Sequence, residues 1–287
     1  MAYDTRRMSE LIDLHTHSTW SDGTLTPSQL VQLAAARKVG VLALTDHDTT
    51  GGLTEARAEC AIHGITLIPG VEITSGWRGQ EIHVVGLAID PDSPALQQHL
   101  AHLLQLRRDR IVAIGERLRK APRFADQDFT AEVLATAPVP TRMHVARAML
   151  AAGAVDTTQD AFDRYLGRGC VGHVPLQWPG VDIAVAAIRA AGGHAVLAHA
   201  HRYKLSAGAL RNLCAEFAAW GGSALEVSLP GMSPGDASRL ASLARQHSLA
   251  GSVASDFHEP GLPWRPLGRF AKLPDGIEPL LSRLKVA

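Results

Sequence analysis

Short apolar runs alternate with amphipathic segments along most of the chain. Apolar runs start at Ile12, Val41 and Ile65, and the segments between them carry apolar residues at helical spacing, such as Leu30 and Leu33. Runs of this length suit strands buried in a sheet, and the segments between them suit helices packed against it. The order strand, helix, strand therefore predicts an α/β fold with a mainly parallel sheet or barrel.

The same alternation returns in the C-terminal part of the chain, so that about seven strands surround one core. We expect strands from 12 to 18 and from 41, then at 65–73, 81–89, 194–201, 224–229 and 250–258. We expect helices from Pro27 to Gly40 and at 53–63, 181–191, 207–220, 234–247 and 277–285. A distorted (β/α)7 barrel is the economical architecture, and a doubly wound open sheet is the alternative.

The pattern between Pro91 and Pro179 is different, because only helical periodicity occurs there. A long helix carries Leu96 to Leu118 at helical spacing, and shorter helices are expected at 131–137, 142–152 and 159–166. The predicted organisation is a barrel in two parts, 1–92 and 180–287, interrupted by an all-helical insertion, 93–179, that serves as a lid or substrate domain. The arginines of Arg107-Arg108-x-Arg110 are interpreted as a solvated face of the long helix.

Composition narrows the function. The 287 residues include 28 Lys plus Arg and 28 Asp plus Glu, so no global basic field exists and stable DNA binding is not expected. The three cysteines, Cys60, Cys170 and Cys214, are far apart, which disfavours disulfide frameworks and thiolate zinc sites. The N-terminus has no apolar signal core and no run reaches the length of a membrane span, so a cytoplasmic protein is expected.

Polar residues with metal-binding side chains follow the apolar runs. Two histidines one residue apart, as in His15-Thr16-His17, point to the same side of an extended strand and can bind one ion. Similar groups end the other runs, and the set of candidate ligands is His15, His17, Asp22, His47, Glu72, His83, His199, Asp256 and His258. In folds of alternating strands and helices, sites form at these strand ends.

Nine ligands exceed the needs of one ion, which takes three or four protein groups and keeps a position for water. Two or three divalent ions are therefore predicted, with Glu72 bridging two of them. Imidazole and carboxylate without thiolate suit Mn²⁺, which we expect, with Zn²⁺ or Fe²⁺ as alternatives.

The sequence blocks that carry these ligands resemble the polymerase-and-histidinol-phosphatase (PHP) family. The blocks are Asp-Leu-His-Thr-His-Ser with the later Ser-Asp-Gly, Leu-Thr-Asp-His-Asp, Pro-Gly-Val-Glu-Ile followed by His83, Ala-His-Ala-His and Ser-Asp-Phe-His. The resemblance implies a distorted (β/α)7 barrel with a multinuclear site that hydrolyses phosphoesters. It further implies three ligand groups: His15, His17, Glu72 and Asp256; Glu72, His83 and His199; and Asp22, His47 and His258. Many relatives have a histidine at the position of Asp22.

Ser-Asp-Gly-x-Leu-x-Pro and the helical insertion resemble a subgroup of nucleoside 3′,5′-bisphosphate phosphatases and a 5′-to-3′ exoribonuclease that trims short RNA. The expected function is metal-dependent hydrolysis of the 3′-phosphate of a nucleoside 3′,5′-bisphosphate, such as pAp to AMP, by a metal-bridging hydroxide. The alternatives are a 5′-to-3′ exoribonuclease on short 5′-phosphorylated RNA, a histidinol-phosphate-type phosphatase, and a non-catalytic metal-binding module. A small phosphorylated nucleotide, or else short RNA, is the expected partner.

Roles in catalysis and substrate binding complete the expectation. The catalytic residues are predicted to be Glu72, Asp256 and His201, the last as a candidate donor of the leaving-group proton. Asp46 and Asp48 are expected to orient His47. Cationic and polar groups for the phosphate that is not cleaved are Arg142, His144, Arg168, His173, Arg202, Tyr203 and Lys204.

Overall fold

The computed structural model describes residues 11–175, 177–261 and 266–284. Backbone contacts divide the chain into two compact units. The sheet unit comprises Met1–Leu100 and Trp178–Ala287, and the helical unit comprises Ala101–Gln177. Each unit is described by itself below.

One seven-stranded sheet forms the centre of the sheet unit, with its strands in sequence order. The pairs β3/β4 and β4/β5 are antiparallel and the other neighbours are parallel. This confirms the α/β class and the mainly parallel sheet. The strands are β1 (Leu11–Asp13), β2 (Val39–Leu44), β3 (Thr66–Trp77), β4 (Gln80–Leu87), β5 (His194–Leu197), β6 (Ala224–Ser228) and β7 (Ala250–Val253).

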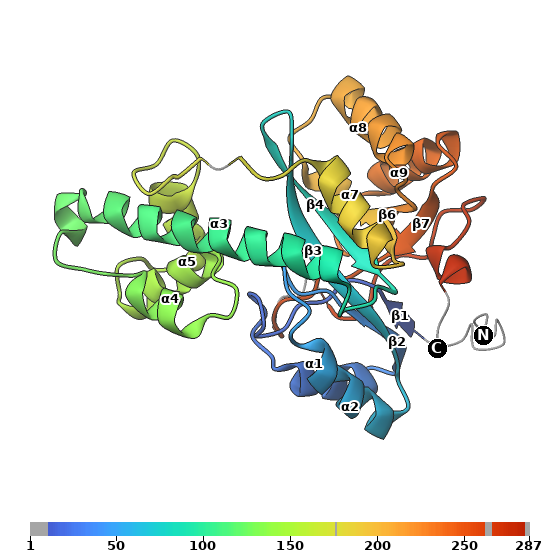
Figure 1. Cartoon of the computed structure of the whole chain (residues 1–287), viewed down its shortest axis with the longest axis horizontal. Helices are drawn as coiled ribbons and strands as arrows, with labels where there is room; N and C mark the ends of the chain where they lie inside the picture. The colour runs from blue at the N-terminus through green and yellow to red at the C-terminus, as the bar shows by residue number, and fades with distance from the viewer. Residues whose placement is uncertain (1–10, 176, 262–265, 285–287) are drawn as a thin grey trace. The chain divides into compact units, whose positions relative to one another are not determined.

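Five helices pack against this sheet, and their ends follow local sequence signals. The α1 helix begins after a capping box in which Thr26 and Gln29 exchange hydrogen bonds, with Pro27 in its first turn. The α2 helix ends at Gly64, whose φ of 66° is left-handed. Figure 1 shows α1 and α2 beside β1 and β2, and α9 beside β6 and β7. The helices are α1 (Pro27–Ala36), α2 (Leu53–His63), α7 (Val181–Ala190), α8 (Ala207–Ala219) and α9 (Pro234–Gln246).

The segment that follows β1 is hydrogen-bonded to the end of β7 and to the segment after it. Leu14 N donates to Val253 O at 3.3 Å, and Asp256 N donates to His15 O at 3.0 Å. The buried Asp13 carboxylate also accepts from Ser255 N at 2.9 Å. These bonds hold the segments that carry the first and last predicted ligands side by side, while full closure as a distorted (β/α)7 barrel stays a prediction.

Several predicted element ends were wrong. The strand predicted at 12–18 ends at Asp13, and the strand predicted at 194–201 ends at Leu197 and continues as a 3₁₀ turn, η4 (Ala200–Arg202). Only a 3₁₀ turn, η5 (Leu280–Arg283), replaces the helix predicted at 277–285, whose last residue lies outside the described part. Pro279 explains this difference, because a proline disfavours helical geometry in the residue before it. The first helix stops at Ala36, and Lys38 turns the chain with a φ of 61°.

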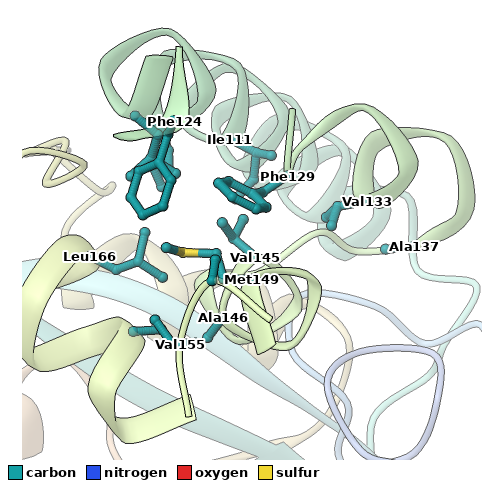
Figure 2. Close-up of a cluster of buried hydrophobic side chains, with 14 residues drawn as sticks. Ile111, Phe124, Phe129, Val133, Ala137, Val145, Ala146, Met149, Val155 and Leu166 are labelled. Atoms are coloured by element: carbon teal, nitrogen blue, oxygen red, sulfur yellow. The ribbon is translucent and has the colours of Figure 1, made fainter. Parts of the chain in front are cut away.

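The helical unit has a hydrophobic core of its own, drawn in Figure 2. Its Phe124 ring makes T-shaped contacts with the rings of Phe129 and Tyr165, at centroid distances of 5.2 Å and 4.9 Å. Met149 and Leu166 are fully buried beside it. The helices are α3 (Pro94–Arg119), which begins in the sheet unit, α4 (Ala131–Thr136), α5 (Arg142–Ala151) and α6 (Thr158–Ala161), with turns η2 (Pro122–Phe124) and η3 (Phe162–Leu166). The predicted boundaries 1–92, 93–179 and 180–287 stay a prediction.

No helix in the described ranges is both long enough and apolar enough to cross a membrane.

Candidate metal centre

The nine predicted ligand side chains lie together in the sheet unit. They come from the segments after β1, β2, β5 and β7 and from within β3 and β4. Most are buried, and only His83 and His258 are half-buried. The gathered residues are His15, His17, Asp22, His47, Glu72, His83, His199, Asp256 and His258, linked through nitrogen–oxygen distances of 3.0–3.7 Å.

The first oxygen of Glu72 faces two histidines. Glu72 lies in β3 and is 0% exposed. Its Oε1 lies 3.0 Å from His83 Nδ1 and 3.0 Å from His199 Nε2. His83 comes from the neighbouring strand β4, and His199 follows β5. This oxygen and the two ring nitrogens therefore form one side of the centre.

The second oxygen of Glu72 faces three other histidines. Its Oε2 lies 3.0 Å from His47 Nδ1 and 3.2 Å from Nε2 of both His15 and His17. The Nε2 atoms of His15 and His17 are themselves 3.0 Å apart. The carboxylate thus stands between two sets of imidazoles, which is the geometry of a bridging ligand.

A further group of ligands surrounds Asp22. Its Oδ1 lies 3.4 Å from His258 Nε2 and 3.7 Å from His47 Nε2. The rings of His17 and His258 stack with centroids 4.0 Å apart. A carboxylate and three imidazoles therefore converge at this edge of the centre, and their ligand atoms lie within 4.8 Å of one another.

Asp256 connects the centre to a cation. Its Oδ1 lies 3.5 Å from His17 Nε2 and 3.7 Å from His15 Nε2, while its Oδ2 accepts a close hydrogen bond from Arg202 Nη1. The predicted phosphate ligand Arg202 thus contacts a predicted metal ligand. A charge-assisted bond of this kind fixes the carboxylate's orientation.

The donor set fits divalent ions. Among the described residues, four buried atoms of the centre make no hydrogen bond of normal geometry, although three of them lie near an oppositely charged group: Asp22 Oδ1, His47 Nδ1, Glu72 Oε2 and His199 Nδ1. Buried polar atoms are normally paired, so a concentration of unpaired ligand atoms at one place fits a site for an ion. Three groups of three or four residues have ligand atoms close enough to share an ion: His17, Asp22, His47 and His258; His15, His17 and Asp256; and His47, Glu72 and His83.

Opposite charges hold some of these side chains in their ionised forms, whereas burial lowers the pKa of His47 and of His199 and favours their neutral forms. Burial alone would raise the pKa of Glu72, but the charges of His15, His47 and His83 hold it well below its usual range. Burial would lower the pKa of His83, but the Glu72 carboxylate raises it to about 10. Without metal, the His83 imidazole therefore carries a proton at pH 7, and a metal ion must displace it.

Three turns of the centre have strained backbones. Asp48, His199 and Asp256 have φ values of 49°, 30° and 53°, in the left-handed region that non-glycine residues rarely adopt. Such conformations persist where the surrounding structure enforces them, and they concentrate at functional sites. Here they turn the chain directly after a strand, so that ligand side chains point to one place.

Asp46 and Asp48 hold the segments on either side of His47. Asp46 accepts hydrogen bonds from Ser18 N at 2.7 Å and from the hydroxyls of Ser18 and Ser21 at 2.6 Å each. Asp48 Oδ1 accepts a hydrogen bond from the backbone N of Thr74, in β3, at 2.7 Å. Asp46 thereby fixes the loop between His17 and Asp22, whereas the predicted orientation of His47 stays a prediction.

Residues 201–204 follow the ligand His199 in the chain. His201 is half-buried, and burial together with the charge of Arg202 lowers its pKa to about 4, so it is neutral at pH 7. The hydroxyl oxygen of Tyr203 accepts a hydrogen bond from His83 N at 2.9 Å, and its ring lies 5.6 Å from that of His199. Lys204 is exposed.

The helical unit gathers arginines around His173. Burial lowers the pKa of His173, and the charges of Arg110, Arg142, Arg117 and Arg168 lower it further. Arg117 Nη1 also donates a close hydrogen bond to the backbone O of His173. We call Arg110, Arg117, Arg142, Arg168 and His173 the arginine cluster. Of these, Arg110 and Arg117 were not among the predicted substrate ligands. Arg110 is only 9% exposed and Arg107 only 8%, so the predicted solvated face is wrong for both.

The fourth predicted substrate ligand of this unit has a structural role at a helix start. His144 Nδ1 accepts from Thr141 N at 3.1 Å, and Thr141 Oγ1 accepts from His144 N at 3.4 Å. The pair forms the capping box that begins α5, with histidine at the position where glutamate is usual.

The sequence reasoning missed one buried carboxylate of the centre. Glu226 lies in β6 and is 1% exposed, and its Oε1 lies 2.7 Å from His15 Nδ1. The available signal was a single acidic residue inside the apolar run Ala224-Leu225-Glu226-Val227. A buried carboxylate is costly unless it is paired, so such a residue marks a partner elsewhere.

Comparisons with known proteins agree with this geometry. The sequence profile of the PHP domain matches residues 13–166. The chain is 46% identical to the 5'-3' exoribonuclease Rnm of Escherichia coli strain K12, over 93% of this chain and 92% of that protein. It is 39% identical to the 3',5'-nucleoside bisphosphate phosphatase of Chromobacterium violaceum, over 96% of each.

A solved structure shares the fold over nearly the whole chain. It is described as a candidate metal-dependent phosphoesterase of Bifidobacterium adolescentis, and it superposes with a TM-score of 0.78 at 29% identity. The match covers 96% of this chain and 94% of the other.

Proposed function

The chain belongs to the PHP domain family and is a metal-dependent phosphoesterase, and from that premise we propose that it removes the 3′-phosphate of nucleoside 3′,5′-bisphosphates, such as pAp. The observation that carries the proposal is the bridging position of Glu72 between two sets of histidines. The bisphosphate phosphatase at 39% identity supports the substrate class.

A second candidate is 5′-to-3′ exonuclease activity on short 5′-phosphorylated RNA, which the relative at 46% identity favours. The two reactions break the same bond. Water attacks phosphorus, the bond between phosphorus and O3′ breaks, and O3′ leaves with a proton. The formal net charge of zero favours the small substrate, because long nucleic acids are usually bound by a basic surface.

The ligand assignment is the one that the resemblance to the PHP family implies, and the short distances around Glu72 support it. His15, His17, Glu72 and Asp256 would hold one ion, Glu72, His83 and His199 a second, and Asp22, His47 and His258 a third. Bound divalent ions would supply an activated water and stabilise charge on the phosphate oxygens. We expect Mn²⁺, because imidazole and carboxylate ligands without thiolate suit it.

Arg202 and Tyr203 were expected to contact the phosphate that is not cleaved, but they contact the candidate metal ligands Asp256 and His83, so we now propose that they bind the phosphate that is cleaved. Arg202 uses Nη1 for Asp256, and the rest of its guanidinium fork is suited to phosphate oxygens. Tyr203 accepts its hydrogen bond from His83 N, which leaves its own O–H as a donor. Burial raises the pKa of Tyr203, so the phenol keeps this proton.

The proton for O3′ is a separate question. His201 is neutral at pH 7 and must bind a proton before it can donate one. Its role as the acid stays a prediction, and His201→Gln tests it. The acid limb of the kcat–pH profile should change in that variant, and an unchanged profile would exclude His201.

We assign the arginine cluster to binding a phosphate group that is not cleaved. Guanidinium groups pair with phosphate through two parallel hydrogen bonds, and several together suit a doubly charged ester. Arg142→Ala and Arg168→Ala are then expected to raise KM for pAp by about 10-fold, equivalent to about 1.4 kcal/mol of lost binding. Turnover of p-nitrophenyl phosphate, which has one phosphate, should stay unchanged. Equal losses on both substrates would contradict the assignment.

The central experiment assays the Mn²⁺-loaded protein with pAp, a 5′-phosphorylated oligoribonucleotide and histidinol phosphate. Phosphate release from pAp at the highest kcat/KM supports the proposal, and AMP release from the oligonucleotide's 5′ end at the highest kcat/KM supports the second candidate. Preference for histidinol phosphate would refute both. A protein that binds Mn²⁺ and hydrolyses none of them would instead be a metal-binding module.

A further inference from the structure

One buried carboxylate outside the ligand set contacts two histidines of the metal centre. Glu226 Oε1 lies 2.7 Å from His15 Nδ1, and Glu226 Oε2 accepts from the backbone N of His199 at 2.6 Å. Among the described residues, Glu226 belongs to none of the three groups whose ligand atoms converge. It contacts His15 at Nδ1, whereas the other ring nitrogen, Nε2, faces Glu72.

The contact with His15 selects the nitrogen that faces the centre. When Nδ1 carries the proton and donates to the carboxylate, Nε2 is left with its lone pair. His15 Nε2 is the atom that lies 3.2 Å from Glu72 Oε2 and 3.0 Å from His17 Nε2. Only an unprotonated nitrogen can bind a metal, so Glu226 makes Nε2 the ligand atom.

The contact with His199 supports a strained turn. His199 has a φ of 30°, a conformation that is unfavourable for a non-glycine residue and persists only where its neighbours enforce it. The charge-assisted bond from its backbone N to Glu226 Oε2 stabilises the turn. The same turn holds His199 Nε2 at 3.0 Å from Glu72 Oε1, on the other side of the bridging carboxylate.

We propose that Glu226 is a positioning residue that sets ligands on both sides of Glu72 at once, by fixing the His15 tautomer and the His199 turn. The proposal rests on the metal centre and not on which phosphate ester is cleaved. Because two ligands depend on one side chain, its loss should weaken metal binding at more than one ion position.

Glu226→Gln tests the proposal with almost no change in shape. A carboxamide offers an oxygen at one end and an NH₂ group at the other. If the NH₂ faces His15, the ring must accept at Nδ1 and carries its proton on Nε2, where the metal should bind. If the NH₂ faces His199, two donors meet and the turn loses its bond. Either orientation is expected to weaken Mn²⁺ binding by about 10- to 100-fold in titration calorimetry.

Glu216→Gln is the matched control. Glu216 also accepts two hydrogen bonds, from Trp77 Nε1 at 2.7 Å and Arg78 Nη2 at 2.5 Å, and neither partner is a predicted ligand. Its Mn²⁺ affinity should equal that of the wild type. Excess Mn²⁺ should restore kcat in Glu226→Gln with KM unchanged, which general damage to the fold would not allow.

Wild-type Mn²⁺ affinity and stoichiometry in Glu226→Gln would overturn the proposal, and so would an equal loss of affinity in the Glu216→Gln control. Glu226→Asp keeps the charge but is too short to reach both partners, so intermediate affinity is expected, and wild-type affinity would also overturn the proposal. If the wild type binds Mn²⁺ but cleaves no nucleotide ester, the proposed function fails while the calorimetric test of Glu226 remains decisive.

Discussion

Replacing Glu72 with glutamine tests the bridging arrangement most directly. The change keeps the size of the side chain but removes one negative charge and turns one ligand oxygen into an NH₂ group. In the wild type, Oε1 and Oε2 lie 3.0–3.2 Å from histidine nitrogens on two sides. The variant therefore loses either one side of the bridge or the other.

The size of the effect follows from the charge. A unit charge about 4 Å from a monovalent partner contributes about 4 kcal/mol at an effective dielectric constant of about 20. For a divalent ion that energy is larger, so Glu72→Gln is expected to weaken Mn²⁺ binding by about three orders of magnitude or more. Metal that is not bound cannot activate water, and phosphoesterase activity should fall to background.

The assay combines metal content after dialysis, calorimetric titration with Mn²⁺, and turnover of pAp. Glu216→Gln serves as the control, because it makes the same chemical change at a carboxylate that binds Trp77 and Arg78 instead. A Glu72→Gln protein with full metal content and full activity would refute the bridging role and the ligand assignment with it.

Three further predictions concern protons, the sheet and the helical unit. His17 and His83 have pKa values of about 9 and about 10 without metal, so Mn²⁺ must displace their protons. The apparent affinity for Mn²⁺ should rise as pH rises above 7, and calorimetry in buffers of different ionisation enthalpy should show proton release. An Mn²⁺ affinity that is constant between pH 7 and 9 would contradict this. Asp13→Ala leaves buried backbone donors without their acceptor, which should lower the free energy of unfolding by about 2–4 kcal/mol in urea titrations; a loss below 1 kcal/mol would show that water replaces the carboxylate. Phe124→Ala should lower the free energy of unfolding by about 3–5 kcal/mol in the same assay, because the ring is fully buried in the core of the helical unit. A negligible change would mean that the core collapses and fills the cavity.

The gathering of the candidate ligands was predictable because most of them follow apolar runs, while Glu72 and His83 lie within such runs. The carboxyl ends of parallel strands lie at the same edge of a sheet, so histidines and carboxylates there lie close to one another. The structure brings all nine together around Glu72, as both the alternation of strands and helices and the family resemblance led us to expect.

Other features were hidden because tertiary contacts decide them. Glu226 stands in mid-strand and looks like an isolated exception until its partner His15, far away in sequence, is known. The left-handed turn at His199 cannot be read from an apolar run that continues to the end of Ala-His-Ala-His, so the strand was predicted too long. Arg110 was taken for a surface charge because helical periodicity does not show which side chains other segments will cover.

The spread of the ligands along the sequence has a consequence for how the protein is made. His15 and Asp256, whose atoms approach within 3.7 Å, are separated by almost the entire polypeptide. During synthesis His15 leaves the ribosome long before Asp256 is made, so a nascent chain offers a cation only part of the ligand set. We therefore expect metal binding to be coupled to the last step of folding. A truncated chain that lacks the final strand should fail to retain metal.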